Sequence, residues 1–271
     1  MCRMLASVAI AMALAAAPAL AATPAAPPAK PSPPTTPTKA PPPAKATAEE
    51  RAQAERLDPL ARAAFWARVV DADPADADAG IKLAKALRAL GRYDEAAAAA
   101  DQVLVTQPTN LEALLESARA KIAAGQGFYA IDSAQRAEAV APKDWRPVTL
   151  LGLALEQSQR DDDALAALRK AASMASDNPA VLSNLGMFYA THGDAASAEP
   201  LLRKAAAAPA AGAQERQNLA LVLGLEGKLD EAEHLLRQDL PPAVVDNDVA
   251  YFRAGTSATG PRSWETLQQA Q

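Results

Sequence analysis

The side chains that most often carry acid–base or metal chemistry are few in this sequence. It has two histidines, His192 and His234, and one cysteine, Cys2. Because a zinc site takes about four nitrogen or sulfur ligands, these residues do not compose one. Three consecutive acids at 161–163 coincide with the expected start of a helix, where negative charge is favourable. We interpret the histidines as surface or helix-end residues and the acidic run as a cap, so no catalytic residue, metal site or cofactor is predicted.

The remaining composition also argues against an enzyme or a nucleic-acid-binding protein. No glycine-rich phosphate loop and no nucleophile motif occurs along the chain. The formal net charge is −5 and the sequence isoelectric point is about 5.2, without a long basic stripe. We therefore expect a non-enzymatic protein that binds neither nucleic acid nor a small-molecule substrate.

A fixed period organises most of the chain. The segments GRYDEA at 91–96 and GKLDEA at 227–232 lie four periods apart if one period is about 34 residues, the length of a known helix–turn–helix repeat. The columns at this spacing are Ala96, Ala130, Ala164, Ala198 and Ala232; Ala84, Ala118, Gly152, Gly186 and Ala220; Gly91, Gly125, Gln159, Gly193 and Gly227; and Leu83, Ser117, Leu151, Leu185 and Leu219. The columns predict repeated pairs of helices.

Close helix packing explains these columns. Small residues let two antiparallel helices approach, and glycine ends the first helix because it reaches a positive φ without a Cβ clash. Pro74, Pro108 and Pro142 recur with the same period and mark the following turn. The sequence predicts an all-α solenoid at 77–240 with five repeats, the last of them shortened. Their ranges are 77–110, 111–144, 145–178, 179–212 and 213–240.

Atypical helices are expected at both ends of the array, because terminal repeats must close the core against water. Residues 48–76 form the predicted N-terminal cap, in which 58–78 resembles a second helix without its pair, and Phe65 and Trp66 are read as its core. Residues 241–271 form the predicted C-terminal capping helix and tail. The side chains expected to cover the last repeat are Val244, Val245, Val249 and Phe252.

The start of the chain predicts export. Arg3 precedes an apolar run from Leu5 to Ala17, and Ala19-Leu20-Ala21 fits a small-x-small cleavage site, so residues 1–21 read as a signal peptide. A retained membrane anchor is the alternative. Residues 22–47 follow as a proline-rich disordered linker, with ten prolines between 23 and 47. It is either a tether for the helical array or a tolerated terminus.

The repeat resembles the tetratricopeptide repeat (TPR). The first copy carries Leu83, Ala84, Gly91, Tyr93, Ala96 and Pro108, and the fourth carries Leu185, Gly186, Tyr189, Gly193 and Ala198. The pattern is specific for the fold and says little about function.

A narrower resemblance covers about residues 57–254. The stretches at 125–130, 144–147 and 217–224 are similar to the TPR component (TadD-like) of the tight-adherence (Flp/Tad) pilus assembly system. That resemblance implies a periplasmic scaffold at the outer membrane that helps the secretin and pilus machinery assemble, with membrane association through its partners. Many members of that family look like lipoproteins with a cysteine directly after the signal; no cysteine follows the signal here, which argues against lipid anchoring but not against secretion. The alternative is a regulatory or scaffolding subunit of another envelope complex, such as one for polysaccharide export.

In repeats of this type, positions 2, 5, 9, 12 and 13 of the first helix line a concave groove. The candidate groove residues are Lys85, Arg88, Arg119, Arg146, Asn184, Met187, Gln217 and Leu221. The arginines either bind an acidic segment of a pilus-assembly partner or are neutralised by neighbouring Glu112, Glu116 and Glu156. The lysine and asparagine of a carboxylate clamp are missing, so capture of a peptide C-terminus is not predicted.

Signal cleavage gives the first testable prediction. We expect the mature N-terminus at Ala22, so the intact mass of the exported protein should lack residues 1–21. Intact-mass spectrometry of the fractionated protein measures this. A full-length chain recovered from the membrane fraction would instead support the anchor.

Overall fold

The computed structural model describes residues 45–257. The predicted signal peptide, most of the predicted linker and the end of the tail therefore lie outside the described residues. The described helices all belong to the compact unit at 42–271. Within residues 45–257, no helix is long and apolar enough to cross a membrane.

The described part of the chain consists of thirteen helices and contains no strand. They are α1 (Ala48–Ala54), α2 (Pro59–Ala72), α3 (Ala77–Ala89), α4 (Tyr93–Thr106), α5 (Leu111–Ala123), α6 (Gly127–Val140), α7 (Trp145–Gln157), α8 (Asp161–Met174), α9 (Pro179–Thr191), α10 (Ala195–Ala207), α11 (Ala213–Leu225), α12 (Leu229–Leu236) and α13 (Pro242–Ser257). The predicted all-α fold is confirmed.

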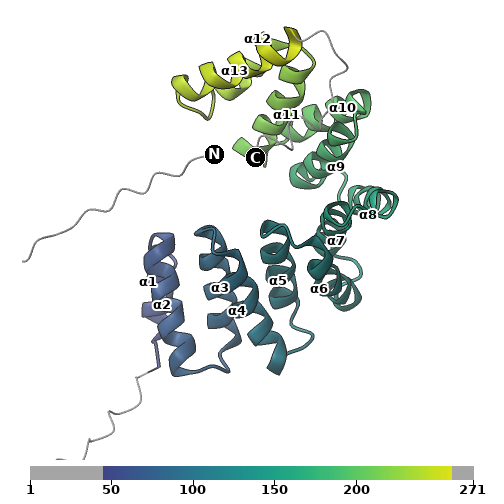
Figure 1. The fold of residues 1–271 in the computed structure, drawn as a ribbon. Coiled ribbons are helices and arrows are strands. Elements are labelled where there is room, and N and C mark those ends of the chain that lie inside the picture. Colours follow the sequence, from purple (N-terminus) through teal and green to yellow (C-terminus); the bar gives the residue numbers. More distant parts are fainter. Residues whose placement is uncertain (1–44, 258–271) are drawn as a thin grey trace, which may run out of the picture. The chain divides into compact units, whose positions relative to one another are not determined.

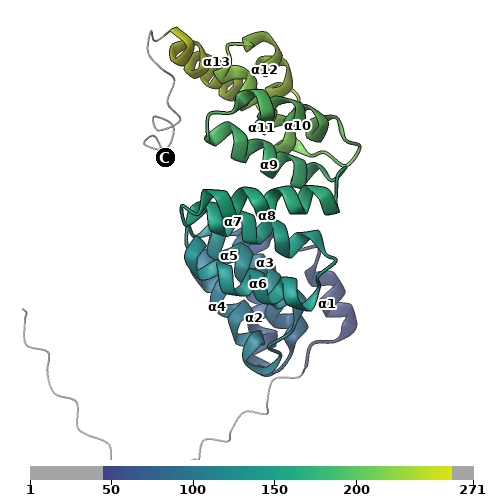
Figure 2. The same cartoon turned by 90° about the vertical axis from the view of Figure 1, so that its right-hand side faces the viewer.

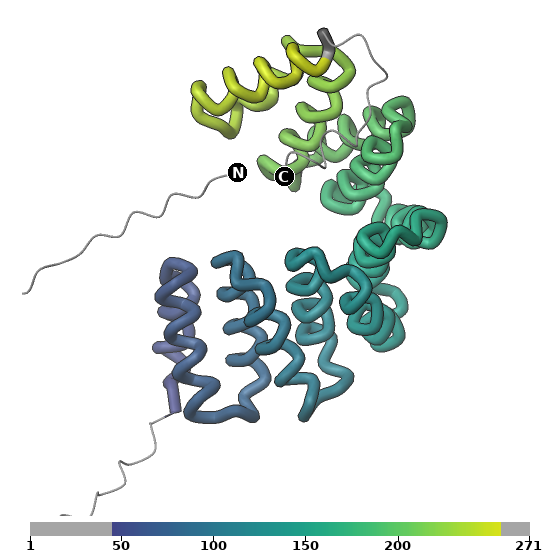
Figure 3. Tube along the Cα trace, viewed as in Figure 1, coloured from purple at the N-terminus to yellow at the C-terminus, as the bar shows by residue number. Residues whose placement is uncertain are grey.

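Helix pairs repeat with the predicted period (Figure 1). The first helices α3, α5, α7, α9 and α11 each begin one period after the last, and so do the second helices α4, α6, α8, α10 and α12. Each first helix packs against its second helix, against the second helix of the preceding pair and against the neighbouring first helices. The tube in Figure 3 shows this alternation along the stack. The expectation of five helix-turn-helix repeats is confirmed.

The turn inside each pair uses one backbone device. The second residue after the first helix has a φ between +58° and +85°, and it is glycine in every pair except the third, where it is Gln159. The amide of the next residue donates back to a carbonyl in the helix, as in Arg92 to Leu87 at 3.0 Å and Arg160 to Leu155 at 3.0 Å. This Schellman-type bond satisfies a carbonyl that the helix end leaves open.

A second column, which was not predicted from the sequence, starts the first helices. Asp76, Asn110, Asp144 and Asn178 are the N-caps of four successive first helices, and the side chain of each accepts a backbone N–H in the first turn. At the fifth position, Gly212, the carboxylate of Glu215 accepts the Gly212 N–H at 2.8 Å instead. These caps stabilise each helix start by about 1 kcal/mol.

The small-residue columns lie at the closest approach of the helices. Every alanine in the column from Ala96 to Ala232 is fully buried. At Gly152, a Cβ atom would lie 2.7 Å from Leu168 Cγ, and at Gly186 it would lie 2.8 Å from Leu202 Cγ. Because such distances are too short for carbon atoms, a leucine of the second helix occupies the space that a larger side chain would need.

The N-terminal cap is a degenerate pair. α1 lies in the sequence register of a first helix but is shortened to seven residues, so the predicted second helix, α2, has a short partner. Trp66 of α2 is completely buried, and Phe65 meets it edge to face with ring centroids 4.9 Å apart. Both aromatic residues therefore belong to the core of the cap, as expected.

The C-terminal cap is α13, which packs on α11 and α12 (Figure 2). Val245, Val249 and Phe252 are buried against the last pair, as predicted. The prediction for Val244 is wrong, since 41% of this residue is exposed. It precedes Val245 by one position and so turns away from the helix face that covers the core.

The one non-glycine turn residue among the five described pairs gives a stability prediction. Gln159 has φ +58°, a conformation that costs a side-chain-bearing residue about 1 kcal/mol. Gln159→Gly should raise the unfolding free energy by up to about 1 kcal/mol, since the greater backbone entropy of unfolded glycine offsets part of the gain. Chemical denaturation measures the change.

The matched control reverses the substitution in the second pair. Gly125 has φ +72°, and an added Cβ would meet no atom within 4 Å. Gly125→Gln should therefore lower the unfolding free energy by about 1 kcal/mol through backbone conformation alone. Stabilisation by Gly125→Gln would contradict this account of the turn.

Candidate protein-binding face

The eight predicted groove residues lie on one set of helices. We call the surface presented by α3, α5, α7, α9 and α11 the first-helix face; consecutive members of this set pack side by side. α3 carries Lys85 and Arg88, α5 carries Arg119, α7 carries Arg146, α9 carries Asn184 and Met187, and α11 carries Gln217 and Leu221. In the structure the four cations form two pairs, and each pair shares one carboxylate. The four uncharged residues lie on the next two first helices, α9 and α11.

A buried carboxylate links the first two arginines. Glu116 of α5 is 1% exposed, and its Oε2 accepts a hydrogen bond from Arg88 Nε at 3.1 Å. Its Oε1 accepts a second hydrogen bond from Arg119 Nη1 at 2.6 Å. A buried carboxylate requires such partners, because desolvation of an unpaired charge is costly. Both arginines therefore serve to satisfy Glu116.

A second carboxylate links the other two cations. Glu112 Oε1 lies 2.9 Å from Arg146 Nη1, and Glu112 Oε2 lies 3.8 Å from Lys85 Nζ. Arg146 also donates from Nε to Asp144 Oδ2 at 2.8 Å. The four cations and three carboxylates leave one unit of net positive charge.

The pKa shifts follow from these contacts. Burial acts to raise the pKa of Asp144, but hydrogen bonds from Arg146 outweigh it and hold the pKa below its usual range. The bond to Asp144 also raises the pKa of Arg146. The predicted neutralisation by Glu112 and Glu116 is therefore present, whereas Glu156, the third expected partner, lies in different surroundings.

Glu156 on α7 is a half-buried carboxylate that was predicted from the sequence only as a counter-ion of the arginines. Its Oε1 accepts a hydrogen bond from the Thr191 hydroxyl at 3.3 Å. Desolvation raises its pKa, although the charge of His192 and the hydrogen bond from Thr191 partly oppose the shift. The position of Glu156 in the repeat pointed to the first-helix face, but only the packed helices show that it pairs with a hydroxyl instead of an arginine.

The C-terminal half of the face carries uncharged side chains, some of them amides and some apolar. Met187 and Leu221 are partly exposed and pack on the core of the last two pairs. Within residues 45–257, the side-chain amides of Asn184 and Gln217 have no hydrogen-bond partner, and both are partly exposed. Asn218, which matches Asn184 in the repeat, instead donates to Ser183 Oγ at 2.9 Å. This half thus presents amides that the fold does not use.

His192 and the acidic run have local structural roles, and His234 lines a pocket. His192 ends α9, where its Nδ1 lies 2.7 Å from the Phe188 carbonyl oxygen and its ring stacks on that of Phe188. His234 lines a pocket of about 390 Å³ together with Arg203 and Glu231. The acids at 161–163 occupy the first turn of α8. Within the described residues, no three His, Cys, Asp or Glu side chains gather as a metal-binding group.

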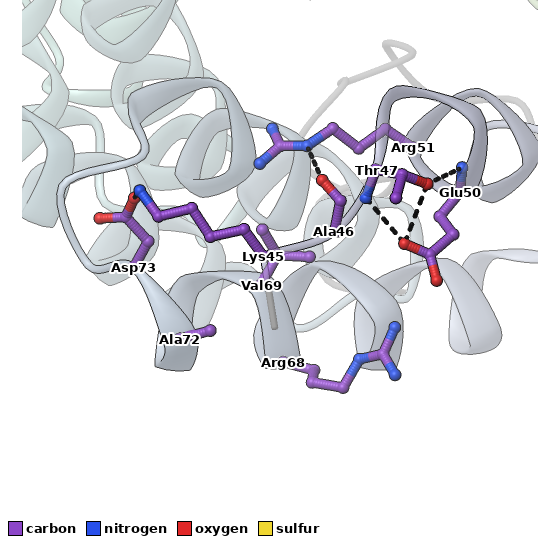
Figure 4. Close-up of a pocket in the computed structure, with 9 residues that line it drawn as sticks. All are labelled: Lys45, Ala46, Thr47, Glu50, Arg51, Arg68, Val69, Ala72 and Asp73. Carbon is purple, nitrogen blue, oxygen red and sulfur yellow. Dashed lines mark hydrogen bonds and ion pairs between the residues drawn. The ribbon is translucent and has the colours of Figure 1, made fainter. Parts of the chain in front are cut away.

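A pocket of about 310 Å³ lies between α1 and α2 (Figure 4). On one wall, Thr47 and Glu50 form a capping box, in which the Thr47 N–H donates to Glu50 Oε2 at 2.7 Å. On the other wall, Lys45 Nζ lies 2.8 Å from Asp73 Oδ2. Because these groups bind one another, the pocket walls stabilise the entry of the chain into α1.

Family comparisons agree with the repeat geometry. Models of the tetratricopeptide repeat match residues 77–120 and 180–208. No curated protein sequence matches the chain significantly.

Solved structures share the fold. TTC0263, a thermophilic TPR protein of Thermus thermophilus, matches with a TM-score of 0.59 at 24% identity, covering 66% of this chain and 99% of its own. A TPR protein of Parabacteroides merdae matches with a TM-score of 0.65 at 12% identity, covering 77% and 86%. MamA of Desulfovibrio magneticus matches with a TM-score of 0.51 at 22% identity, covering 58% and 89%. These identities support the fold alone.

The raised pKa of Glu156 gives a pH-dependent prediction. Its folded-state pKa lies above its ordinary value of 4.5, so the ionised carboxylate destabilises the fold at neutral pH, and this effect disappears as the pH falls below 4.5. Glu156→Gln should therefore raise the Tm at about pH 7, and the two proteins should converge at about pH 4. Thermal unfolding followed by circular dichroism at both pH values measures this.

Glu199 supplies a control of opposite sign. Hydrogen bonds from Lys228 and Arg203 lower its pKa, so its ionised form stabilises the fold at neutral pH. Glu199→Gln should lower the Tm at about pH 7. An equal decrease for Glu156→Gln would contradict the desolvation argument.

Proposed function

Because the chain is built from tetratricopeptide repeats, we propose that it acts as a non-enzymatic scaffold that binds protein partners through its first-helix face. TPR domains bind protein segments, and this face carries Asn184 and Gln217, whose amides have no partner within the described residues. These two amides are the observation that carries the proposal. An extended segment offers backbone N–H and C=O groups that match them.

The specific setting that we propose is assembly of the tight-adherence (Flp/Tad) pilus in the periplasm. The resemblance over residues 57–254 and the pattern of residues 1–21, which matches a signal peptide, support this setting. Its partners would then be the secretin or other assembly proteins at the outer membrane. A scaffold role in polysaccharide export is the alternative, favoured only by the general repeat pattern.

The contacts on the face determine how the partner binds in this proposal. The partner backbone hydrogen-bonds to Asn184 and Gln217, while its apolar side chains pack on Met187 and Leu221. An acidic residue of the partner would have to compete with Glu112 or Glu116 for Arg119 and Arg146. We therefore expect charge–charge contacts to contribute less to the affinity than the amide and apolar contacts, because those charges are largely neutralised within the chain.

The test removes the two available amides. Asn184→Ala with Gln217→Ala should weaken co-purification of the assembly partner about tenfold and reduce surface pili, because the buried partner groups lose their hydrogen bonds. Quantitative co-purification and electron microscopy of surface pili in the native host measure the two effects.

The control changes exposed amides of the second helices. Gln102→Ala with Gln135→Ala removes exposed glutamines from α4 and α6 and should leave both readouts at wild-type level. Wild-type levels of pili in the Asn184 and Gln217 double variant would contradict the proposed contact. If deletion of the whole gene leaves the pili normal but abolishes an exported polysaccharide, that result would favour the alternative.

A further inference from the structure

The second repeat exposes an aromatic pair that plays no part in repeat packing. Phe128 and Tyr129 lie in the first turn of α6 and are 73% and 66% exposed. Their rings meet edge to face, with centroids 5.6 Å apart. Large apolar side chains left in water forgo the gain of burial, so an adjacent exposed pair points to contact with another molecule.

The corresponding positions of the other repeats are small or acidic. They are Asp94 and Glu95, Asp162 and Asp163, Ala196 and Ser197, and Asp230 and Glu231. Acids stabilise the start of a helix by interacting with its dipole. Neither the helix start nor the packing therefore requires aromatic side chains in the second repeat.

Two carboxylates lie near the pair. Gln126 Nε2 donates to Asp94 Oδ1 at 2.8 Å, which places the start of α4 beside the start of α6. Asp132 follows Phe128 by one helical turn, and its Oδ2 pairs with Arg136 Nη1 at 3.3 Å, while 75% of its side chain stays exposed. We call Phe128, Tyr129, Asp94 and Asp132 the aromatic edge.

The charge of the edge selects among possible occupants. Nucleic acid and an anionic lipid surface would be repelled by Asp94, whereas Arg136 offsets the charge of Asp132. A second copy of the chain, with a formal net charge of −5, would bring like charges together. A cationic side chain, by contrast, is attracted both to the carboxylates and to the ring faces.

We propose that the aromatic edge binds an extended segment of a partner protein that contains lysine and proline. Proline rings and extended backbone pack on exposed aromatic rings, and the lysine ammonium then lies between a ring and a carboxylate. This site lies on a second helix and does not depend on the first-helix face or on the proposed role in pilus assembly.

The test replaces the aromatic pair of the second repeat with the residues that the first repeat has at the equivalent positions. Phe128→Asp with Tyr129→Glu creates the acidic pair that the first repeat has at 94–95, so the variant should fold with unchanged Tm. Fluorescence anisotropy with a labelled peptide of Pro-Pro-Lys triplets measures binding to the full mature chain. The double variant should bind this peptide at least about tenfold more weakly than the wild type.

Matched peptides separate the contributions of proline and of lysine to binding, and a matched variant tests whether any exposed aromatic residue suffices. Peptides of Gly-Gly-Lys and Pro-Pro-Glu triplets should bind the wild type weakly, because each lacks one of the two features. Tyr251→Glu changes a 46% exposed aromatic residue on α13 and should leave binding of Pro-Pro-Lys unchanged.

Three results would overturn the proposal. They are no binding of Pro-Pro-Lys by the wild type, equal binding by the double variant, and equal binding of Gly-Gly-Lys. A concentration-dependent dimer in sedimentation that the double variant abolishes would instead identify a second copy as the occupant. Because peptide binding is measured directly, none of these outcomes depends on whether the chain assembles pili.

Discussion

The close approach of two helices within each pair is the constraint on which the rest of the structure depends. Ala96 and its repeat equivalents are fully buried, and the glycines at 152 and 186 leave room for a leucine of the second helix. Because the interface is filled by small residues, the pairs stack with neighbouring first helices side by side. The charged and amide side chains of these helices are thereby gathered on one face, where a partner segment can reach them.

Backbone devices at the helix ends keep this stacking in register. Each first helix starts at a capped position and ends at a residue with positive φ, followed by a hydrogen bond back into the helix. These devices act over a short stretch of chain and recur in every pair. Gln159 keeps the same conformation as the glycines, which shows that the packing of the pair imposes the turn even where the residue type opposes it.

The two halves of the first-helix face use their polar groups differently. Toward the N-terminal half, Glu116 takes up hydrogen bonds from Arg88 and Arg119, so these charges contribute more to the stability of the array than to a binding site. Toward the C-terminal half, Asn184 and Gln217 have no partner among residues 45–257. Because the charges of this face are neutralised internally, its affinity for a partner relies on amide and apolar contacts. At the aromatic edge, by contrast, charge influences which partner is selected.

The sequence by itself determined the fold class, the repeat period and the caps, because evenly spaced columns of small residues, glycine and leucine report contacts that recur locally in every pair. It also placed Lys85 and Arg146 on the correct set of helices. Only the tertiary structure decided which charges are already paired, since Glu112 joins cations from two other helices that are distant in sequence. The exposure of Phe128 was likewise decided there: an aromatic residue reads as core in sequence, and only the packed neighbours show that no described helix covers it.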